Sequence, residues 1–311
     1  MTQASAPGKI ILFGEHAVVY GRPAIAVPLP SIRATVEVDA LPPKDRSGIL
    51  IQSPALDLSF LLSEVGSENP LGLAVHLTLQ TLQVTYPANM RITIRSDIPL
   101  SAGLGSGAAV TVAMVRAICR HFSRSLGDEQ ISKIAYEVEK LHHGTPSGVD
   151  NTVISYEMPV YFQRGKPVER FSIHKPISIV MGHSGESSST AQVVGQVRKS
   201  WESNRSGYES TFDSIGRITD LAYAALKRGD LELLGPLMDQ NQMHLEALGV
   251  SNKKLDHLIV SAKKAGAAGA KLSGAGQGGF MIALVEPAKA QAVMDALESA
   301  GSTQVFRARI A

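Results

Sequence analysis

Several charged side chains interrupt apolar stretches of this sequence, where they could transfer protons or hold a ligand. Lys9 precedes the apolar run 10–13, and Glu15 and His16 follow soon after it. Asp150 lies between a turn-rich segment and apolar residues, which favours partial burial. A lysine such as Lys9 beside a buried carboxylate would keep it ionised, so Asp150 could accept a proton. Lys9, Glu15 and His16, each taken alone, also suit a solvated surface position.

Glu139 is a candidate ligand for a divalent cation, because it lies on an expected helix over residues 129–142 that leads towards Asp150. The sequence contains no Gly-x-Ser-x-Gly elbow and no His-Glu-x-x-His pair. Their absence argues against the commonest hydrolase chemistries.

The first glycine loop, residues 99–109, follows an expected strand and leads into an expected helix over residues 108–122. Backbone N–H groups and the positive helix end would meet there, which is how an anion is held without charged side chains. The loop lacks the Gly-Lys-Ser/Thr of a Walker motif, and an alanine at 108 breaks the dinucleotide fingerprint. A tight strand-to-helix turn is the alternative. The candidate phosphate-binding residues are Pro99, Gly103, Leu104, Gly105, Ser106, Gly107 and Ala108.

A second glycine loop spans residues 271–280 and matches Gly-x-Gly-x-x-Gly at 274, 276 and 279. A strand pattern follows it, whereas a dinucleotide site requires a helix. Glycine this dense suggests backbone packed against a ligand or against another loop, although a hairpin turn would also use one or two of these glycines.

These loops are embedded in a sheet-rich first half and a helix-rich second half, which predicts an α+β protein with two lobes, residues 1–170 and 171–311. A strand at 49–51 is expected to pair with the strand at 32–38. From 190 to 265 helix is expected, with breaks near 204–207, 228–230 and 249–252. The other expected elements are strands at 9–12, 90–94, 160–163, 177–181, 270–272, 280–285 and 304–310, and helices at 70–82 and 287–300.

The composition points to a small-molecule partner. Thirty basic and 28 acidic residues leave a net charge of +2, without a dense basic block, so binding to nucleic acid is not expected. Cys119 is the single cysteine, which rules out an internal disulfide, and its apolar setting predicts a buried, inert thiol. No stretch has the length of a signal peptide or membrane span, so the expected location is cytoplasmic.

Three segments in order, Pro-Gly-Lys-Ile-Ile-Leu-Phe-Gly-Glu-His from Pro7, Pro-Leu-Ser-Ala-Gly-Leu-Gly-Ser-Gly-Ala-Ala from Pro99, and Lys-Leu-Ser-Gly-Ala-Gly-Gln-Gly-Gly from Lys271, resemble the GHMP kinases. Within that family the segments 14–21, 143–151 and 247–250 look most like the mevalonate kinase branch. The resemblance implies a two-lobed fold with a mixed α/β N-terminal lobe, a helix-rich ferredoxin-like C-terminal lobe and an active site in the cleft. It implies ATP and Mg²⁺ as cofactors, mevalonate as substrate, and is compatible with a homodimer.

The resemblance also assigns roles to residues. Asp150 matches the catalytic base and Lys9 the lysine that pairs with it. Glu139 matches the acidic ligand of Mg²⁺, with Ser106 as a second ligand on the phosphate loop. The positions that match the surroundings of the substrate are Glu15, His16, Ser147 and Gly148.

Gly107 departs from the commonest family pattern, which has a second serine at this position. Without the hydroxyl of that second serine, Glu139, Ser106, phosphate oxygens and water remain as the expected ligands of Mg²⁺. Other members of the family, acting on phosphomevalonate or homoserine, and a non-catalytic ligand sensor with the same fold remain alternatives.

Overall fold

The computed structural model describes residues 1–42, 48–66, 68–84, 89–100, 103–143 and 146–311. The chain forms two compact units that alternate along the sequence. The first comprises Met1–Gly8, Pro30–Pro99 and Gly105–Glu157, and the second comprises Lys9–Leu29, Leu100–Leu104 and Met158–Ala311. The strands β1 (Thr2–Phe13) and β2 (Ala24–Ala40) therefore contribute residues to both units. The predicted lobe boundary at residue 170 stays a prediction.

In the first unit the strands lie in the order β4 (Leu58–Leu61), β3 (Ile49–Ser53), β5 (Met90–Ser96), β2, and β1 also pairs with β2. The predicted pairing of 49–51 with the strand at 32–38 is wrong. The strand β3 instead runs parallel to β5 and antiparallel to β4. The intervening helix α1 (Pro70–Thr81) supplies the crossover that a parallel pair of strands requires.

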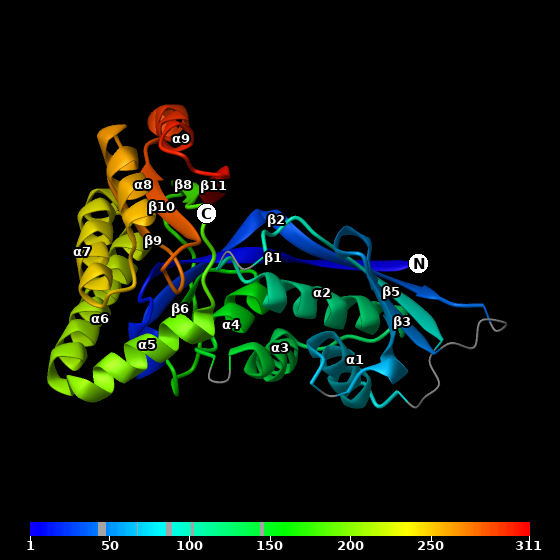
Figure 1. Ribbon diagram of the computed structural model, residues 1–311. Coiled ribbons are helices and arrows are strands. Elements are labelled where there is room, and N and C mark those ends of the chain that lie inside the picture. Colours follow the sequence, from blue (N-terminus) through cyan, green and yellow to red (C-terminus); the bar gives the residue numbers. More distant parts are fainter. Residues whose placement is uncertain (43–47, 67, 85–88, 101–102, 144–145) are drawn as a thin grey trace. The chain divides into compact units, whose positions relative to one another are not determined.

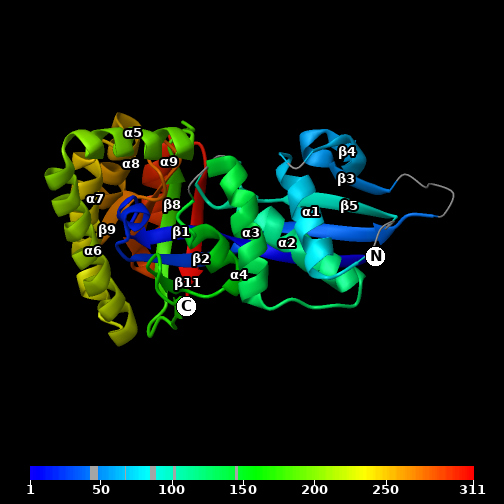
Figure 2. The same cartoon turned by 90° about the horizontal axis from the view of Figure 1, so that it is seen from below.

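Helices cover one face of these strands, as the two views in Figures 1 and 2 show. They are α1, α2 (Ser106–His121), α3 (Asp128–His143) and the short α4 (Val149–Tyr156). The alternation of β2 explains this arrangement, because Ala34, Val36 and Val38 are buried while Arg33 and Thr35 are half-exposed. The helix α4 was not expected from the sequence.

The second unit contains a four-stranded antiparallel sheet in the order β11 (Val305–Ile310), β8 (Ile177–His183), β10 (Phe280–Val285), β9 (Gly269–Leu272). The helices α8 (Lys253–Lys264) and α9 (Ala290–Ser299) pack against it. Their order along the chain, with helices between β8 and β9 and between β10 and β11, is that of a ferredoxin-like fold. This confirms the expected C-terminal architecture.

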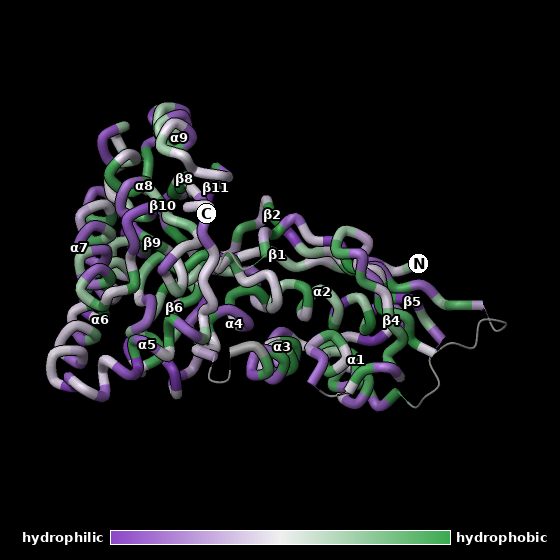
Figure 3. Tube along the Cα trace, viewed as in Figure 1, coloured by the Kyte–Doolittle hydropathy of each residue, from purple (hydrophilic) through white to green (hydrophobic). Residues whose placement is uncertain are grey.

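The remaining helices of this unit are α5 (Thr190–Ser203), α6 (Arg205–Arg228) and α7 (Leu234–Ala247). The predicted breaks coincide with the ends of these helices. Asn204 and Asn252 cap the N-termini of α6 and α8, and Gly229 caps the C-terminus of α6. Buried residues such as Ile215, Ile218 and Ala222 recur every three or four positions of α6, as expected for a helix with one buried face, and the tube of this helix is largely white to hydrophilic in Figure 3. Among the helices that the structure describes, none has the length and apolar character needed to cross a bilayer.

The short elements complete the chain. In the second unit β6 (Val160–Phe162) pairs with Ala24–Ala26 of β2 and with β7 (Glu169–Arg170). Single 3₁₀ turns occur at Ala17–Tyr20, Pro54–Leu56, Leu62–Glu64, Leu231–Leu233 and Pro287–Lys289.

Candidate active site

The first glycine loop ends at the N-terminus of α2. Gly105 caps the helix with a left-handed backbone (φ +75°), and its carbonyl accepts the first helical hydrogen bond from the Ala109 amide at 2.9 Å. The amides of Ser106, Gly107 and Ala108 therefore have no helical acceptor, and no acidic residue lies in this first turn. This arrangement suits an anion. Ser101 and Ala102 of the same motif lie outside the described residues.

Glu139 of α3 lies beside this helix start. A Cβ atom added to Gly107 would lie 3.2 Å from Oε1 of Glu139, so the carboxylate is directly adjacent to the phosphate loop. Among the described residues no group of three or more His, Cys, Asp or Glu side chains could hold a metal. Magnesium commonly takes one or two carboxylates together with phosphate oxygens and water, so Glu139 with Ser106 fits this ion.

Asp150 lies in the first turn of α4. Gly148 caps this helix with φ +92°, and the Val149 amide donates to Oγ of Ser147 at 3.3 Å. The next residue, Asn151, is buried and its amide donates to the Ser132 hydroxyl of α3 at 2.9 Å. The structure thus places Asp150 on a helix anchored to α3, the helix that carries Glu139. Ser147 and Gly148, predicted to face the substrate, shape the start of this helix.

Lys9 is buried in the interior of β1, whereas the sequence predicted a strand that begins at this residue. The strand is longer than expected, because its pairing with β2 extends it back to Thr2. In the second unit the Lys9 amide donates to the carbonyl of Leu104 at 2.9 Å, so Lys9 adjoins the first glycine loop. Lys9 and Asp150 belong to different units, and their pairing stays a prediction.

Glu15 forms a buried ion pair with Lys271, a residue that the sequence analysis did not single out as a partner. Both side chains are fully buried, and Nζ of Lys271 also donates to the carbonyl of Leu272 at 2.6 Å. Burial raises the pKa of Glu15 and lowers the pKa of Lys271, while their mutual attraction opposes both shifts. Oε2 of Glu15 has no hydrogen-bond partner among the described residues, which leaves a buried acceptor for a ligand hydroxyl.

His16 has a positive φ (+58°) with ψ −49°, a backbone conformation outside the main allowed regions for non-glycine residues, and such outliers cluster at functional sites. Burial lowers its pKa, so the ring is neutral near pH 7. Its Nε2 lies 2.8 Å from the carbonyl oxygen of Ala275. Because a carbonyl only accepts, we assign the proton to Nε2, which leaves Nδ1 as an acceptor. Glu15 and His16 are thus buried in the turn expected after the first strand, and neither occupies a solvated surface position.

The second glycine loop packs against other segments of its own unit. A side chain on Gly276 would overlap the carbonyl of Val250, and one on Gly278 would lie 2.7 Å from the carbonyl of Glu186. Gln277 donates from its side chain to the carbonyl of Gly249 at 2.7 Å. Gly274 closely approaches the first loop, since an added Cβ would lie 3.7 Å from Cα of Gly103. The prediction that this backbone packs against another loop is confirmed.

Comparison with known proteins agrees with this arrangement. Models of the GHMP kinase N-terminal domain and of the GHMP kinase C-terminal domain match residues 71–158 and 222–303. Mevalonate kinases from Pyrococcus abyssi and Thermococcus sibiricus are 38% and 36% identical to the chain, and each alignment covers 97% of it and 94% of the relative. The chain belongs to the GHMP kinase family.

Solved structures support this membership. The crystal structure of L. major mevalonate kinase in complex with R-mevalonate superposes with a TM-score of 0.84 at 27% identity, covering 100% of this chain and 96% of that one. The chain is therefore a kinase of the GHMP fold that uses ATP.

Sequence reasoning missed Lys271 as a partner of Glu15. One signal could have found it: a lone lysine in an otherwise apolar strand, directly before a glycine loop, must be paired if it is buried. It also missed Ser273, whose hydroxyl donates to the carbonyl of Ile11 at 3.0 Å. A single serine in a glycine loop carries no signal for such a contact.

Proposed function

We propose that this GHMP kinase is a mevalonate kinase, which transfers the γ-phosphoryl group of ATP to the 5-hydroxyl of mevalonate to give 5-phosphomevalonate and ADP. The observation that carries the proposal is the 36–38% identity to curated mevalonate kinases over 94% of their length. The relative from L. major that superposes closely was solved in complex with R-mevalonate. The product would serve isoprenoid precursor synthesis.

The residues divide the chemistry between them. Asp150 accepts the proton of the attacking hydroxyl, and Lys9 favours the ionised forms of both groups. The α2 amides at Ser106 and Gly107 hold the phosphates, where fixed dipoles stabilise developing charge. Catalysis of phosphoryl transfer rests mainly on such positioning and charge stabilisation.

Glu15 and His16 are proposed to contact the substrate. Each offers a buried acceptor, Oε2 of Glu15 and Nδ1 of His16, which suits the hydroxyl groups of a small polyhydroxy acid. Glu139 and Ser106 are the proposed Mg²⁺ ligands. The ion would neutralise charge on the phosphate oxygens when bound.

An ADP-release assay with a substrate panel tests the proposal. We expect turnover with mevalonate and none with homoserine or phosphomevalonate. Turnover confined to either of the latter two would overturn the substrate assignment, whereas no turnover with any of them would favour a ligand sensor. A cytoplasmic location and a homodimeric state also stay predictions, which cell fractionation and sedimentation would check.

A further inference from the structure

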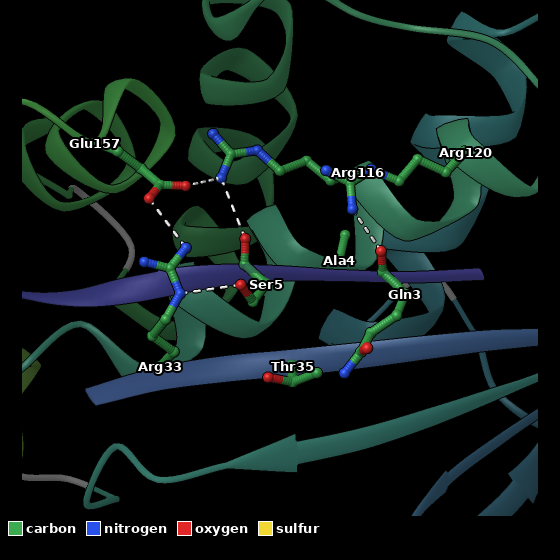
Figure 4. Close-up of a pocket in the computed structure, with 8 residues that line it drawn as sticks. All are labelled: Gln3, Ala4, Ser5, Arg33, Thr35, Arg116, Arg120 and Glu157. Carbon is green, nitrogen blue, oxygen red and sulfur yellow. Dashed lines mark hydrogen bonds and ion pairs between the residues drawn. The ribbon is translucent and has the colours of Figure 1, made fainter. Parts of the chain in front are cut away.

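A cavity of about 390 Å³ lies within the first unit, at a distance from the phosphate loop. Its lining consists of Gln3, Ala4, Ser5, Arg33, Thr35, Arg116, Arg120 and Glu157 (Figure 4). Arg116 is ten residues beyond Ser106 on α2, which corresponds to ~15 Å along the helix axis. The cavity contains none of the residues assigned to ATP, Mg²⁺ or mevalonate.

Three guanidinium groups converge on this cavity from two elements. Arg116 and Arg120 lie one turn apart on α2 and donate to the β1 carbonyls of Ser5 at 3.3 Å and Gln3 at 2.5 Å. Arg33 comes from the half-exposed face of β2, and its Nε donates to the Ser5 hydroxyl at 2.9 Å. Figure 4 shows Arg33 and Arg116 beside Glu157 and Ser5, and Arg120 beside Gln3 of the same strand.

The positive charge of the cavity is only partly balanced. Glu157 is the single carboxylate of the lining and bonds both Arg33, at 2.9 Å, and Arg116. Asp128 lies outside the lining, 3.9 Å from Arg116. Arg120 is exposed, and its guanidinium donates to the carbonyl of Gln3. The lining thus carries three positive charges and one negative charge, a net charge of +2.

Glu157 occupies the place that an external anion would take. It is the C-cap of α4 and has a left-handed backbone (φ +49°), a conformation that costs a non-glycine residue free energy. The two arginines that hold it offer planar, multiple donors, which suit carboxylate and phosphate alike. The hydroxyls of Ser5 and Thr35 and the amide of Gln3 add neutral donors around them.

We propose that this cavity is a second anion site, which binds a small phosphorylated molecule through Arg33, Arg116 and Arg120 in competition with the carboxylate of Glu157. The volume exceeds what a phosphate group alone would fill and lies within the range of small-ligand pockets. An organic part of modest size therefore fits beside the phosphate group.

Occupancy of the site acts on α4. Glu157 lies seven residues after Asp150, ~10 Å along the same short helix. A bound anion that takes the arginines from Glu157 removes the ion pairs that fix the C-terminal end of α4, while Arg116 still holds the carbonyl of Ser155. This second step rests on the proposed function, because it assumes that Asp150 is the base. It predicts a lower kcat with an unchanged KM for ATP.

Inorganic phosphate is the probe. Calorimetric titration is carried out with Mg²⁺ and a saturating non-hydrolysable ATP analogue, so that the phosphate loop is filled and turnover plays no part. We expect Arg33→Gln and Arg120→Gln each to weaken phosphate binding about tenfold. Glu157→Gln should strengthen it, because the internal competitor loses its charge. Arg95→Gln is the matched control, since Arg95 is an exposed arginine of β5 that pairs with Glu37 outside the lining.

Equal phosphate affinity in the wild type, Arg120→Gln and Arg95→Gln would overturn the site, as would weaker binding by Glu157→Gln. Thermal unfolding identifies a variant that fails to fold. If Arg33→Gln or Arg120→Gln does so, the other arginine variant and Glu157→Gln still test the site. The kinetic step is tested separately: phosphate should reduce kcat of the wild type, and Arg120→Gln should need about tenfold more phosphate for the same reduction. If binding follows the expected pattern and kcat does not change, the coupling to α4 fails while the site stands. Failure of the proposed function would appear in the substrate panel alone.

Discussion

The two glycine loops use the same residue for different purposes. Gly107 in the first loop is exposed, and among the residues that the structure describes an added Cβ would meet Oε1 of Glu139, at 3.2 Å. Gly276 in the second loop has no room for any side chain, because it lies against the carbonyl of Val250. The first loop leaves its amides open at a helix start, whereas the second fills its own surroundings with backbone. Glycine density alone therefore does not distinguish a ligand site from a packing site; what lies within reach of the missing Cβ does.

The largest expected effect separates chemistry from packing. Asp150→Asn removes the proposed base and should lower kcat by about 10²–10⁴-fold. Steady-state kinetics measures the loss, and ATP-analogue binding and thermal unfolding should remain as in the wild type. Near-normal turnover would exclude Asp150 as the base.

Lys271 lies near the end of β9, directly before the glycines of the second loop, and its replacement tests whether that region is structural. Lys271→Met leaves the Glu15 carboxylate buried without its cation and should cost ~3–5 kcal/mol in the free energy of unfolding. Glu15→Gln combined with Lys271→Met should cost much less than the single change. Denaturant unfolding of both variants checks this, and equal losses would contradict the role of the pair.

The same variant has a defined pH dependence. In Lys271→Met, burial without the opposing ion pair holds the pKa of Glu15 above its unfolded value, so the folded state binds more protons than the unfolded state between the two. Stability relative to the wild type should therefore rise as the pH falls from neutrality towards 5. A pH-independent difference would indicate that Glu15 remains ionised.

Gly276→Ala tests the crowded loop directly. Its positive φ and the overlap with Val250 should together destabilise the protein by roughly 2–4 kcal/mol. Gly301→Ala is the matched control, with φ +88° and nothing within 4 Å of the added Cβ, and should cost only about 1 kcal/mol. Thermal unfolding of both separates overlap from backbone strain. Equal losses would mean that strain alone requires Gly276.

The smallest effect on stability is expected at the open loop. Gly107→Ala should change the free energy of unfolding by less than ~1 kcal/mol, because alanine favours the helix and Glu139 needs to shift only slightly. That shift should raise the Mg²⁺ concentration required for half-maximal activity. Titration of activity with Mg²⁺ checks this, and an unchanged requirement would argue against Glu139 as a ligand.

The sequence predicted most elements because their patterns are local. The helix breaks near Asn204, Gly229 and Asn252 follow from caps that act within one turn. The position of β3 was wrong because pairing depends on a crossover through α1, which no alternation along the strand encodes. The helix α4 was missed because its eight residues are too few for a clear period.

In the candidate site, too, the features encoded locally could be predicted from the sequence, whereas those that depend on distant contacts could not. The loop at the start of α2 could be recognised from its glycines and from the helix that follows. Glu139 could be recognised because it lies on the expected helix 129–142, which leads towards Asp150. The ion pair of Glu15 with Lys271 joins residues 256 positions apart, so only the fold reveals it. The burial of Lys9 was not foreseen because a lysine at the first residue of an expected strand usually reaches water.

The interleaving of the two units along the chain has a consequence for how the protein is made. The second unit needs Lys9–Leu29 from the start of the chain and Met158–Ala311 from its end. During synthesis its early strands must wait for most of the polypeptide before they find their partners, and contacts of such wide separation slow folding. The two units are therefore not independent domains in series. Because each unit is built from separated segments, no single cut in the sequence would release either unit whole.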